Sequence, residues 1–301
     1  MTWRSVIITT PAQLRHKNGA LVVRQNGNDI SVPLEDIATV IIDCPQITLT
    51  SQLLAAFASQ KIAVITVDET HTPNGVLLSY LPHSRALQVM RKQMNLTQPH
   101  KKRLWQHIIQ QKLINQSSVL QQHNHSIQAN ILIQLSNEVR SGDPDNLEGQ
   151  GAQVYFRALF TPTFHRAQSR FYNASLNYGY SIIRSAFARS LVSHGFLTAF
   201  GIHHHSEQNA FNLADDLIEP YRAILDAHVL KCYPVEPKHE LRPEDKAKIV
   251  SILHQDISRI EKGELSGRST VLSLIDSTVI SFRQRVDDGN IHLILPNLDI
   301  S

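Results

Sequence analysis

The stretch ETHTPNGV, Glu69–Val76, divides the chain into two parts of different character. Its mixture of Pro, Asn and Gly is typical of a turn or linker. Before it, short β-branched runs such as Ala20–Gln25 (ALVVRQ) are separated by Asn-Gly turn signals. After it, long segments such as Lys101–Asn124 carry apolar residues at three- and four-residue steps, the period of a helix. The sequence therefore predicts an α+β protein, with a small β-rich domain over residues 1–76 and a larger all-α domain over residues 77–301.

The individual elements follow from the same local patterns. Strands are expected where β-branched residues run between turns, and helices where apolar residues line one face. The expected strands are Val6–Thr10, Ala20–Gln25, Asp29–Leu34, Thr39–Asp43 and Ile62–Asp68, and the expected helices include Thr50–Gln60, Ser84–Met94, Lys101–Asn124 and Ile127–Arg140.

Composition and charge bound the class of protein. Of the 301 residues, 42% are hydrophobic, and no apolar run approaches the ~20 residues of a membrane span. The N-terminus lacks the apolar run of a secretory signal, and the two cysteines, Cys44 and Cys232, have no C-x-x-C spacing. We therefore expect a protein of the reducing cytoplasm that does not associate with a membrane. A net charge of +3 does not by itself indicate a nucleic-acid binder, whereas the sixteen histidines offer neutral metal ligands.

The segment Gly195–Arg222, GFLTAFGIHHHSEQNAFNLADDLIEPYR, carries the strongest chemical signal. It places the triplet His203–His205 upstream of three carboxylates, Asp215, Asp216 and Glu219. At about 100° per residue, positions four apart in a helix share nearly one azimuth, so these carboxylates crowd one face. Like charges so spaced repel one another, and a positive partner is therefore expected among them.

Two kinds of partner satisfy that expectation. A divalent metal would take one imidazole and two carboxylates, a mixed nitrogen and oxygen set that suits manganese or magnesium better than zinc. Alternatively, Arg222 lies three residues after Glu219 and pairs with it as an ordinary ion pair. A zinc hydrolase built on the triplet is disfavoured, because the chain lacks the H-E-x-x-H helix spacing.

A further carboxylate stands in SGDPDNLEGQGAQVYF, residues 141–156. Asp143 precedes a proline and is a good N-cap, so a helix is expected to begin there. Glu148 then falls near the positive end of this helix, where the ordinary role of an acid is to complement the helix dipole. Gly149 and Gly151 each cost about 1 kcal/mol relative to Ala inside a helix, which indicates that another backbone or a ligand approaches closely.

A polar stripe is expected on a helix over Arg170–Val192. Its members, Asn173, Asn177, Tyr180 and Arg184, recur at helical spacing. Because Asn is a poor helix former, such a stripe is unusual for a plain surface helix. The amides either cap and bridge neighbouring elements or face a ligand.

Basic side chains gather at the start of the helical part. They are Arg85, Arg91, Lys92, Lys101, Lys102 and Arg103. These side chains either form an ordinary solvated surface or line a groove that binds the phosphate backbone of a nucleic acid. Trp105, close to them in sequence, either stacks on a base or packs between helices.

Together these motifs resemble the CRISPR-associated integrase, the metal-dependent nuclease and integrase of CRISPR adaptation. The resemblance rests on LEGQGAQVYF around Glu148, on NASLNYGY from Asn173 to Tyr180, and on GIHHHSEQNAFNLADDLIEPYR with His204 and Glu219. It covers essentially the whole chain, including the β-then-α layout. The wording of the last motif is most like the type II branch, which works beside a single large effector nuclease.

The resemblance implies a set of site residues. Glu148, His204 and Glu219 would be catalytic and would bind Mg²⁺ or Mn²⁺. Matching GIHH to the family's Gly-x-x-His pattern selects His204, while His203 and His205 stay open as alternatives. The residues expected to support this set or to face DNA are Asp216, Asn173, Asn177 and Tyr178. The candidate DNA contacts are Arg85, Lys92, Lys101, Lys102, Arg103, Arg184 and Arg222.

The resemblance also implies a reaction and partners. The 3′-OH of a short DNA fragment would attack a phosphodiester where the CRISPR leader meets the repeat, and the missing P-loop agrees with a transesterification that needs no nucleoside triphosphate. The implied assembly is a homodimer formed through the β domains. Two such dimers would join one dimer of a small ferredoxin-like adaptation partner in a heterohexamer, with other type II adaptation proteins as further candidate partners.

Two other functions stay open from the sequence. A generic metal-dependent nuclease would cut branched or single-stranded DNA and would be indifferent to a blocked 3′ end. A non-catalytic DNA-binding scaffold would have its acidic cluster paired with Arg222 and nearby cations.

Overall fold

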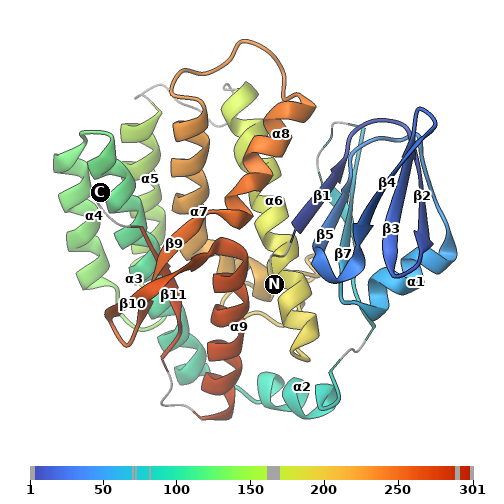
Figure 1. Cartoon of the computed structure of the whole chain (residues 1–301). Helices are drawn as coiled ribbons and strands as arrows, with labels where there is room; N and C mark the ends of the chain where they lie inside the picture. Colours follow the sequence, from blue (N-terminus) through green and yellow to red (C-terminus); the bar gives the residue numbers. More distant parts are fainter. Residues whose placement is uncertain are drawn as a thin grey trace.

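The computed structural model describes residues 4–69, 71, 73–80, 83–160, 170–288 and 292–298. Figure 1 shows the strands of the N-terminal part at one side of a bundle of helices. The prediction of an α+β chain, β-rich at its N-terminal end and mostly helical afterwards, is therefore confirmed. The division after residue 76 stays a prediction, and the last strand before the helices, β8, spans Pro73–Leu77.

The first N-terminal sheet is a meander of antiparallel strands with one parallel strand at its edge. Asn18 and Gly19 have left-handed φ angles of 51° and 72°, as the predicted two-residue turn between β2 and β3 requires. The helix α1, Ser51–Ser59, follows this sheet and begins at Thr50, whose hydroxyl accepts the Leu53 N–H. In spatial order the strands are β4 (Asn28–Pro33), β3 (Ala20–Gln25), β2 (Ala12–Lys17) and β6 (Ile47–Leu49).

The second N-terminal sheet lies between the first sheet and the helices. Its order is β1 (Arg4–Ile8), β5 (Ile37–Ile42), β7 (Ala63–Val67) and β8, with only the β7–β8 pair antiparallel. Neighbouring residues of a strand point to opposite faces. In β5, Val40 accordingly joins the core shared with α1, and Ile41 joins the core of the helical part. Burial on both faces explains why this strand reads as an almost continuous apolar run.

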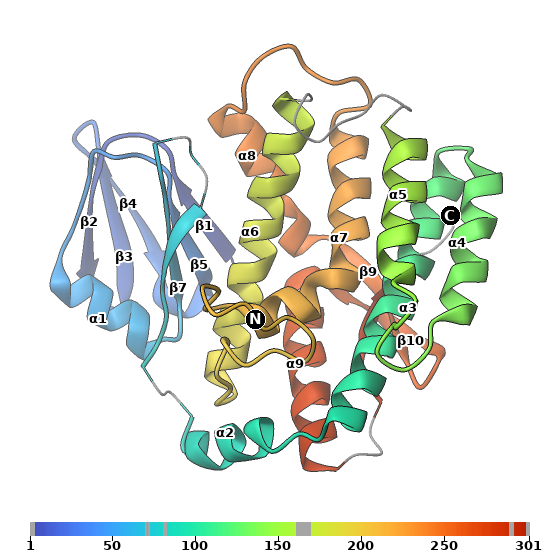
Figure 2. The same cartoon turned by 180° about the vertical axis from the view of Figure 1, so that it is seen from behind.

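The helical part is built around α3 and α7. α3 packs against α4, α5 and α7, and α7 packs against α6. Seen from behind in Figure 2, α2 lies across the bottom and connects the strand part to α3. The helices are α2 (Ala86–Met94), α3 (Gln98–Gln122), α4 (Ser126–Glu138), α5 (Leu147–Leu159), α6 (Arg170–Ser193), α7 (Asn212–Cys232), α8 (Pro243–Val250) and α9 (Val271–Asp287).

One part of the fold prediction needs correction, because the C-terminal part is not all-α. A small antiparallel sheet, in the order β10 (Glu264–Thr270), β9 (Asp256–Glu261) and β11 (Leu295–Asn297), packs beside α9. A tight turn at Lys262 and Gly263, with φ angles of 55° and 83°, joins β9 to β10. These strands have few buried apolar residues, so their alternation is too weak to be read from the sequence.

Most predicted elements are confirmed with small shifts of their ends. The helices expected over Thr50–Gln60 and Ser84–Met94 correspond to α1 and α2, and the longer ones to α3 and α4. The short strands β2, β6 and β8 were not predicted. Within the described residues, no helix is long and apolar enough to cross a membrane.

Candidate active site

Three helices, α3, α5 and α7, meet where the predicted catalytic residues lie. Gly151 of α5 allows α3 to come close, because a Cβ at this position would lie 2.2 Å from the Leu113 Cδ2. Gly151 has a close neighbour, but it is the Leu113 side chain of α3 and not the backbone or ligand that was predicted. At Gly149 the nearest atoms belong to Asn146, the residue that caps the same helix.

The helix that carries Glu148 begins later than predicted. Asp143 does not start it, since its carbonyl oxygen accepts the Asn146 N–H in a turn. α5 instead begins at Leu147, after a left-handed N-cap at Asn146 with φ 52°, whose side chain accepts the Gly149 N–H. The Asp143 carboxylate still caps the helix by accepting the N–H groups of Leu147 and Glu148. Glu148 lies in the first turn, where the helix dipole favours an acid.

Lys112 of α3 joins the two predicted catalytic carboxylates. Its Nζ lies 2.6 Å from Glu148 Oε1 and 2.5 Å from Glu219 Oε2. Arg222, almost one turn further along α7, donates from Nε to Glu219 Oε1 at 2.8 Å. The Glu219 side chain is 5% exposed and that of Glu148 is 29% exposed. The cluster is therefore buried at Glu219 and open to solvent at Glu148.

Burial and charge act in opposite directions on these groups. Burial alone would raise the pKa of Glu219, but Lys112 and Arg222 outweigh it and lower the pKa to about 2. Burial alone would lower the pKa of Lys112, but the attraction of Glu219 and Glu148 outweighs it and the pKa is raised. The pKa of Arg222 is raised in the same way, mainly by Glu219. Lys112, Arg222 and Glu219 therefore stay charged near neutral pH.

Asp216 organises the histidine triplet. Its buried carboxylate accepts the backbone N–H groups of Ile202, His203 and His204, and it bonds to the His204 Nδ1 at 2.7 Å. A Cβ at Gly201 would lie 2.3 Å from the His204 carbonyl oxygen, so only glycine fits this tight loop. The bond to Asp216 is the largest cause of the raised pKa of His204. In neutral His204 the same bond places the proton on Nδ1 and leaves the Nε2 lone pair available.

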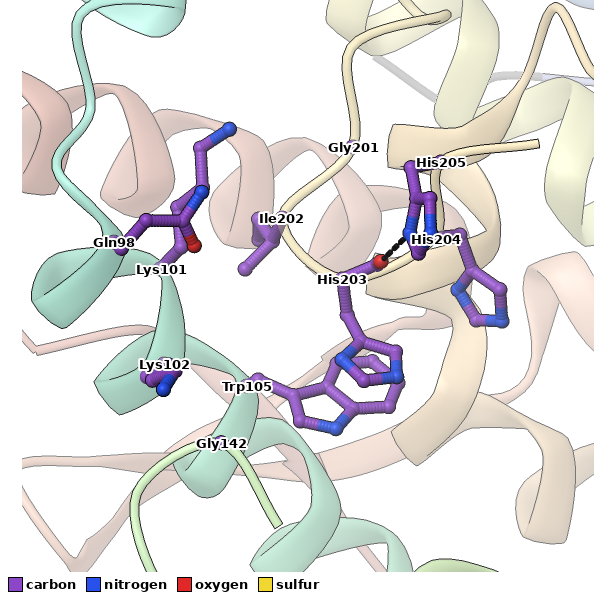
Figure 3. Close-up of a pocket in the computed structure, with 10 residues that line it drawn as sticks. All are labelled: Gln98, Lys101, Lys102, Trp105, Gly142, Gly201, Ile202, His203, His204 and His205. Carbon is purple, nitrogen blue, oxygen red and sulfur yellow. Dashed lines mark hydrogen bonds between the residues drawn. The ribbon is translucent and has the colours of Figure 1, made fainter. Parts of the chain in front are cut away.

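His203 lies flat against Trp105, with ring centroids 4.1 Å apart and planes inclined by 2° (Figure 3). Trp105 is only 1% exposed, so its packing role is confirmed and its role as an open stacking platform is wrong in this structure. A cavity of about 430 Å³ opens beside these rings. Lys101 and Lys102 line its opposite side, which makes the cavity basic (Figure 3).

The predicted catalytic residues come from three segments far apart in the sequence. Glu148 opens α5, Glu219 lies in α7, and His204 lies in the loop between α6 and α7. Glu219 is near enough to His204 to help raise its pKa. Among the described residues, no group of three or more His, Cys, Asp or Glu side chains is arranged to hold a metal ion. Lys112 lies between the two carboxylates instead.

The residues predicted to support the site divide into two groups. Asp216 lies beside His204, as expected. The Tyr178 ring faces elsewhere, toward Lys246 at 5.6 Å, and Lys246 pairs with Asp43 of the strand part at 2.6 Å. On α6, Asn177 is exposed and Asn173 is half-buried.

Tyr180, from the same predicted polar stripe, is buried. Its hydroxyl bonds to Asp226 Oδ1 at 2.5 Å, and Tyr155 donates to Asp226 Oδ2 at 2.9 Å. The Arg222 guanidinium lies over the Tyr180 ring, 4.7 Å from its centroid. Tyr180 therefore serves helix packing and steadies Arg222, which in turn binds Glu219.

The candidate DNA contacts are spread over several places. Lys101 and Lys102 line the cavity beside the histidines, and Arg103 is exposed next to them in sequence. Arg85 and Lys92 line a separate groove on α2, where Lys92 pairs with Asp287. Two further arginines are held near acids of α7: Arg184 lies 3.8 Å from Asp215, and Arg222 binds Glu219.

Lys112 was missed by the sequence analysis, although one signal could have found it. It follows Trp105 and Ile108 by seven and four residues, so it falls on the apolar stripe of α3. A lysine in such a stripe is almost never fully buried unless it is paired. Its position therefore indicates that buried acids from other elements meet it.

Comparisons with known proteins identify the family. The sequence profile of the family described as CRISPR associated protein Cas1 matches residues 6–245. The chain therefore belongs to the Cas1 family of CRISPR-associated proteins. A CRISPR-associated endonuclease Cas1 from Neisseria meningitidis serogroup C (strain 8013) is 42% identical over 291 residues, which is 96% of this chain and 94% of the relative.

Solved structures share the fold. A casposase bound to integration product is similar with a TM-score of 0.76 and 18% identity, over 97% of this chain and 92% of the casposase chain. A chain from a Cas6-RT-Cas1–Cas2 complex is similar with a TM-score of 0.72 and 18% identity, over 96% of this chain and 35% of that longer chain. At these identities the likeness shows the fold alone.

Proposed function

We propose that this chain is a metal-dependent DNA endonuclease and integrase that inserts short foreign DNA fragments into a CRISPR array. Membership of the Cas1 family supports a role in CRISPR systems. The name of the 42% identical relative, an endonuclease, supports enzymatic action on nucleic acid. The similar casposase, which was solved with an integration product, is consistent with joining as the reaction.

The observation that carries the proposal is the convergence of Glu148 and Glu219 on one cation. Both carboxylates direct an oxygen at the Lys112 ammonium, so a position that binds a cation lies between them. Carboxylate oxygens and an imidazole nitrogen are donors that manganese accepts, and magnesium shares the preference for oxygen. His204 would supply the imidazole donor, because Asp216 holds its Nδ1 and leaves Nε2 to bind. The donor set is therefore suited to Mn²⁺ or Mg²⁺, provided that Lys112 moves.

Each group has a task in the proposed reaction. Glu148, Glu219 and the Nε2 of His204 would hold the metal, which when bound neutralises charge on the phosphate under attack. Lys101 and Lys102 would bind phosphates of DNA that enters the cavity, and these contacts position the strand without reading its sequence. The 3′ oxygen of the fragment would form a new P–O bond as the bond from phosphorus to the 3′ oxygen of the array strand breaks. The attacking hydroxyl would release one proton and the departing oxygen would take one up, so no nucleoside triphosphate is consumed.

The proposed substrates and partners follow the family. The substrates would be a short DNA fragment and the leader–repeat junction of a CRISPR array, in the cytoplasm. A Cas2-type partner is supported by the similar chain from a Cas6-RT-Cas1–Cas2 complex. We propose that this partner is small and ferredoxin-like, and that one partner dimer joins two homodimers of this chain in a heterohexamer.

One observation favours a second candidate, a non-catalytic DNA-binding scaffold. Both acids are paired with cations, Lys112 and Arg222, as a scaffold would have them. The desolvation penalty of a buried ion cluster is, however, larger than that of a surface ion pair, so such a cluster stabilises a fold only weakly. Because Glu219 is almost fully buried, an active site explains the cluster better.

A strand-transfer assay tests the proposal. The chain and its partner would be mixed in Mn²⁺ with a short labelled duplex and a supercoiled plasmid that bears a leader and repeat. We expect label to join the plasmid only when the duplex has free 3′-OH ends. Cutting without joining, indifferent to a 3′ block, would favour a generic nuclease, and tight DNA binding without any product would favour the scaffold.

A further inference from the structure

We propose that Lys112 is an internal counter-ion that fills the cation position of the metal-free site, and that a divalent metal displaces it. The inference rests on the proposed function, since it concerns the same two carboxylates. Lys112 would then be a positioning residue that keeps Glu148 and Glu219 together and sets how tightly the metal binds.

Lys112 holds both carboxylates at once. Its Nζ lies 2.6 Å from Glu148 Oε1 and 2.5 Å from Glu219 Oε2. A magnesium ion bound to carboxylates sits about 2.0–2.1 Å from their oxygens. A metal held by these two oxygens would therefore compete with the Lys112 ammonium for the same position, and the two cations would exclude each other.

The charges of the cluster are balanced without a metal. Two cationic side chains, Lys112 and Arg222, face two acidic ones, Glu148 and Glu219. A divalent ion added to this balanced set would leave two uncompensated positive charges in a largely buried place, which is costly. Displacement of the lysine ammonium reduces that excess, and a DNA phosphate can neutralise the rest.

The two cations differ in their freedom to move. The guanidinium of Arg222 is held against the Tyr180 ring, whose hydroxyl is fixed by Asp226. The Lys112 ammonium bonds to the two carboxylates and sits on a flexible four-carbon stem. Lys112 is therefore the cation that can leave, and Arg222 the one that stays.

Titration calorimetry with Mn²⁺ alone tests the inference without any catalytic readout. We expect Lys112→Met to bind Mn²⁺ with a Kd at least about tenfold lower than the wild type, which equals about 1.4 kcal/mol. Lys246→Met is the matched control, because Lys246 is equally buried and paired with Asp43 at 2.6 Å. Its Kd should stay within about twofold of the wild-type value. A Lys112→Met protein that binds Mn²⁺ no more tightly than the wild type overturns the inference.

A second measurement uses the unaltered chain, so it does not depend on the folding of a variant. An amine-reactive reagent with peptide mass spectrometry would report the accessibility of Lys112 with and without saturating Mn²⁺. We expect several-fold faster labelling of Lys112 with metal and unchanged labelling of Lys246. If Lys112 is labelled equally slowly with and without saturating Mn²⁺, the inference is overturned.

Glu148→Gln separates this inference from the proposed function. Loss of Mn²⁺ binding in Glu148→Gln supports the metal site, and the Lys112 measurements then decide the counter-ion role alone. If neither the wild type nor Lys112→Met binds Mn²⁺, both the metal site and the counter-ion role are overturned. If only Lys112→Met binds Mn²⁺, the lysine blocks the site but the metal does not displace it, which overturns the inference.

Discussion

The substitution Asp216→Asn tests how the histidine loop is held. In the wild type, one carboxylate oxygen accepts the Ile202 and His203 N–H groups, and the other accepts the His204 N–H and bonds to its Nδ1. Asparagine has nearly the same shape, but one of its two atoms is an NH₂ that cannot accept. With the NH₂ turned toward Ile202 and His203, two backbone donors lose their acceptor. With the NH₂ turned toward His204, only the His204 backbone N–H does, because the Nδ1 of neutral His204 can accept instead.

The magnitude follows from the donors that are left without an acceptor, each of which costs about 1–3 kcal/mol. The orientation with the NH₂ toward His204 leaves one such donor and is the less costly, so a loss of about 1–3 kcal/mol is expected. Asp215→Asn is the matched control. Asp215 accepts from the Asn209 side chain and lies 3.8 Å from Arg184, a looser setting in which we expect a loss below about 1 kcal/mol.

Urea unfolding of the two variants beside the wild type measures this difference. Limited proteolysis of the loop between α6 and α7 would show whether Asp216→Asn opens it locally. We expect lower urea midpoints and faster loop cleavage for Asp216→Asn, with Asp215→Asn close to the wild type. Equal midpoints and equal cleavage rates for the two variants would refute the assignment of Asp216 as the anchor of the loop.

Three further predictions follow from the site. Gly201→Ala should lower the melting temperature and the joining rate together, because the added Cβ would lie 2.3 Å from the His204 carbonyl oxygen. Glu219→Gln should be less stable than the wild type near neutral pH, and the gap should close as pH falls. The pKa of Glu219 in the folded protein is about 2, below its ordinary value of 4.5. The ionised carboxylate therefore stabilises the fold above pH 4.5, and this contribution is lost as the pH falls toward 2. Urea unfolding at several pH values would measure it. Lys101→Ala with Lys102→Ala should weaken DNA binding and reduce the slope of log K against log salt by up to about two, measured by fluorescence anisotropy.

Two of these predictions have a control variant, and each of the three has a result that contradicts it. Ser206→Ala changes an exposed residue of the same loop as the glycine and should leave stability unchanged; an equal effect of both changes would contradict the packing argument. Lys17→Ala with Lys238→Ala removes two exposed lysines outside the cavity, and an equal drop in salt slope would contradict a specific role for the cavity. A stability gap for the Glu219 variant that stays constant with pH would contradict its lowered pKa.

The histidine loop and its acids could be predicted because their spacing is local. Asp216 and Glu219 lie within one helix, so a period of about 3.6 residues already places them together. The tight approach at Gly151 was also visible, because a glycine inside a helix has a cost that must be offset elsewhere. Such arguments need only the geometry of one element.

Lys112 shows what local geometry leaves out. Its role depends on how α3 crosses α5 and α7, and only the packed structure brings Glu148 and Glu219 to its ammonium. The ion pair Asp43–Lys246 between the strand part and α8 is a second contact of this kind. Neither contact joins residues at a sequence spacing from which it could be predicted.

The strands were not predicted for a different reason, which is their low content of buried apolar residues. In β2, AQLRHK, only Ala12 and Leu14 are buried, and residues such as Gln and Lys have low strand propensity. β9 and β10 are similarly poor in buried apolar residues. Their formation depends on pairing with neighbours and on packing against α9, which a single-sequence pattern does not show.

The central claim is that Glu148, His204 and Glu219 form one metal-dependent site that joins DNA. The most direct measurement compares the wild type, Glu148→Gln and the control Glu138→Gln, an exposed acid of α4, in the Mn²⁺ strand-transfer assay with free 3′-OH ends. We predict joining by the wild type and by Glu138→Gln, and none above background by Glu148→Gln, while all three bind the DNA fragment with similar affinity. Joining by Glu148→Gln at the wild-type rate would contradict the account.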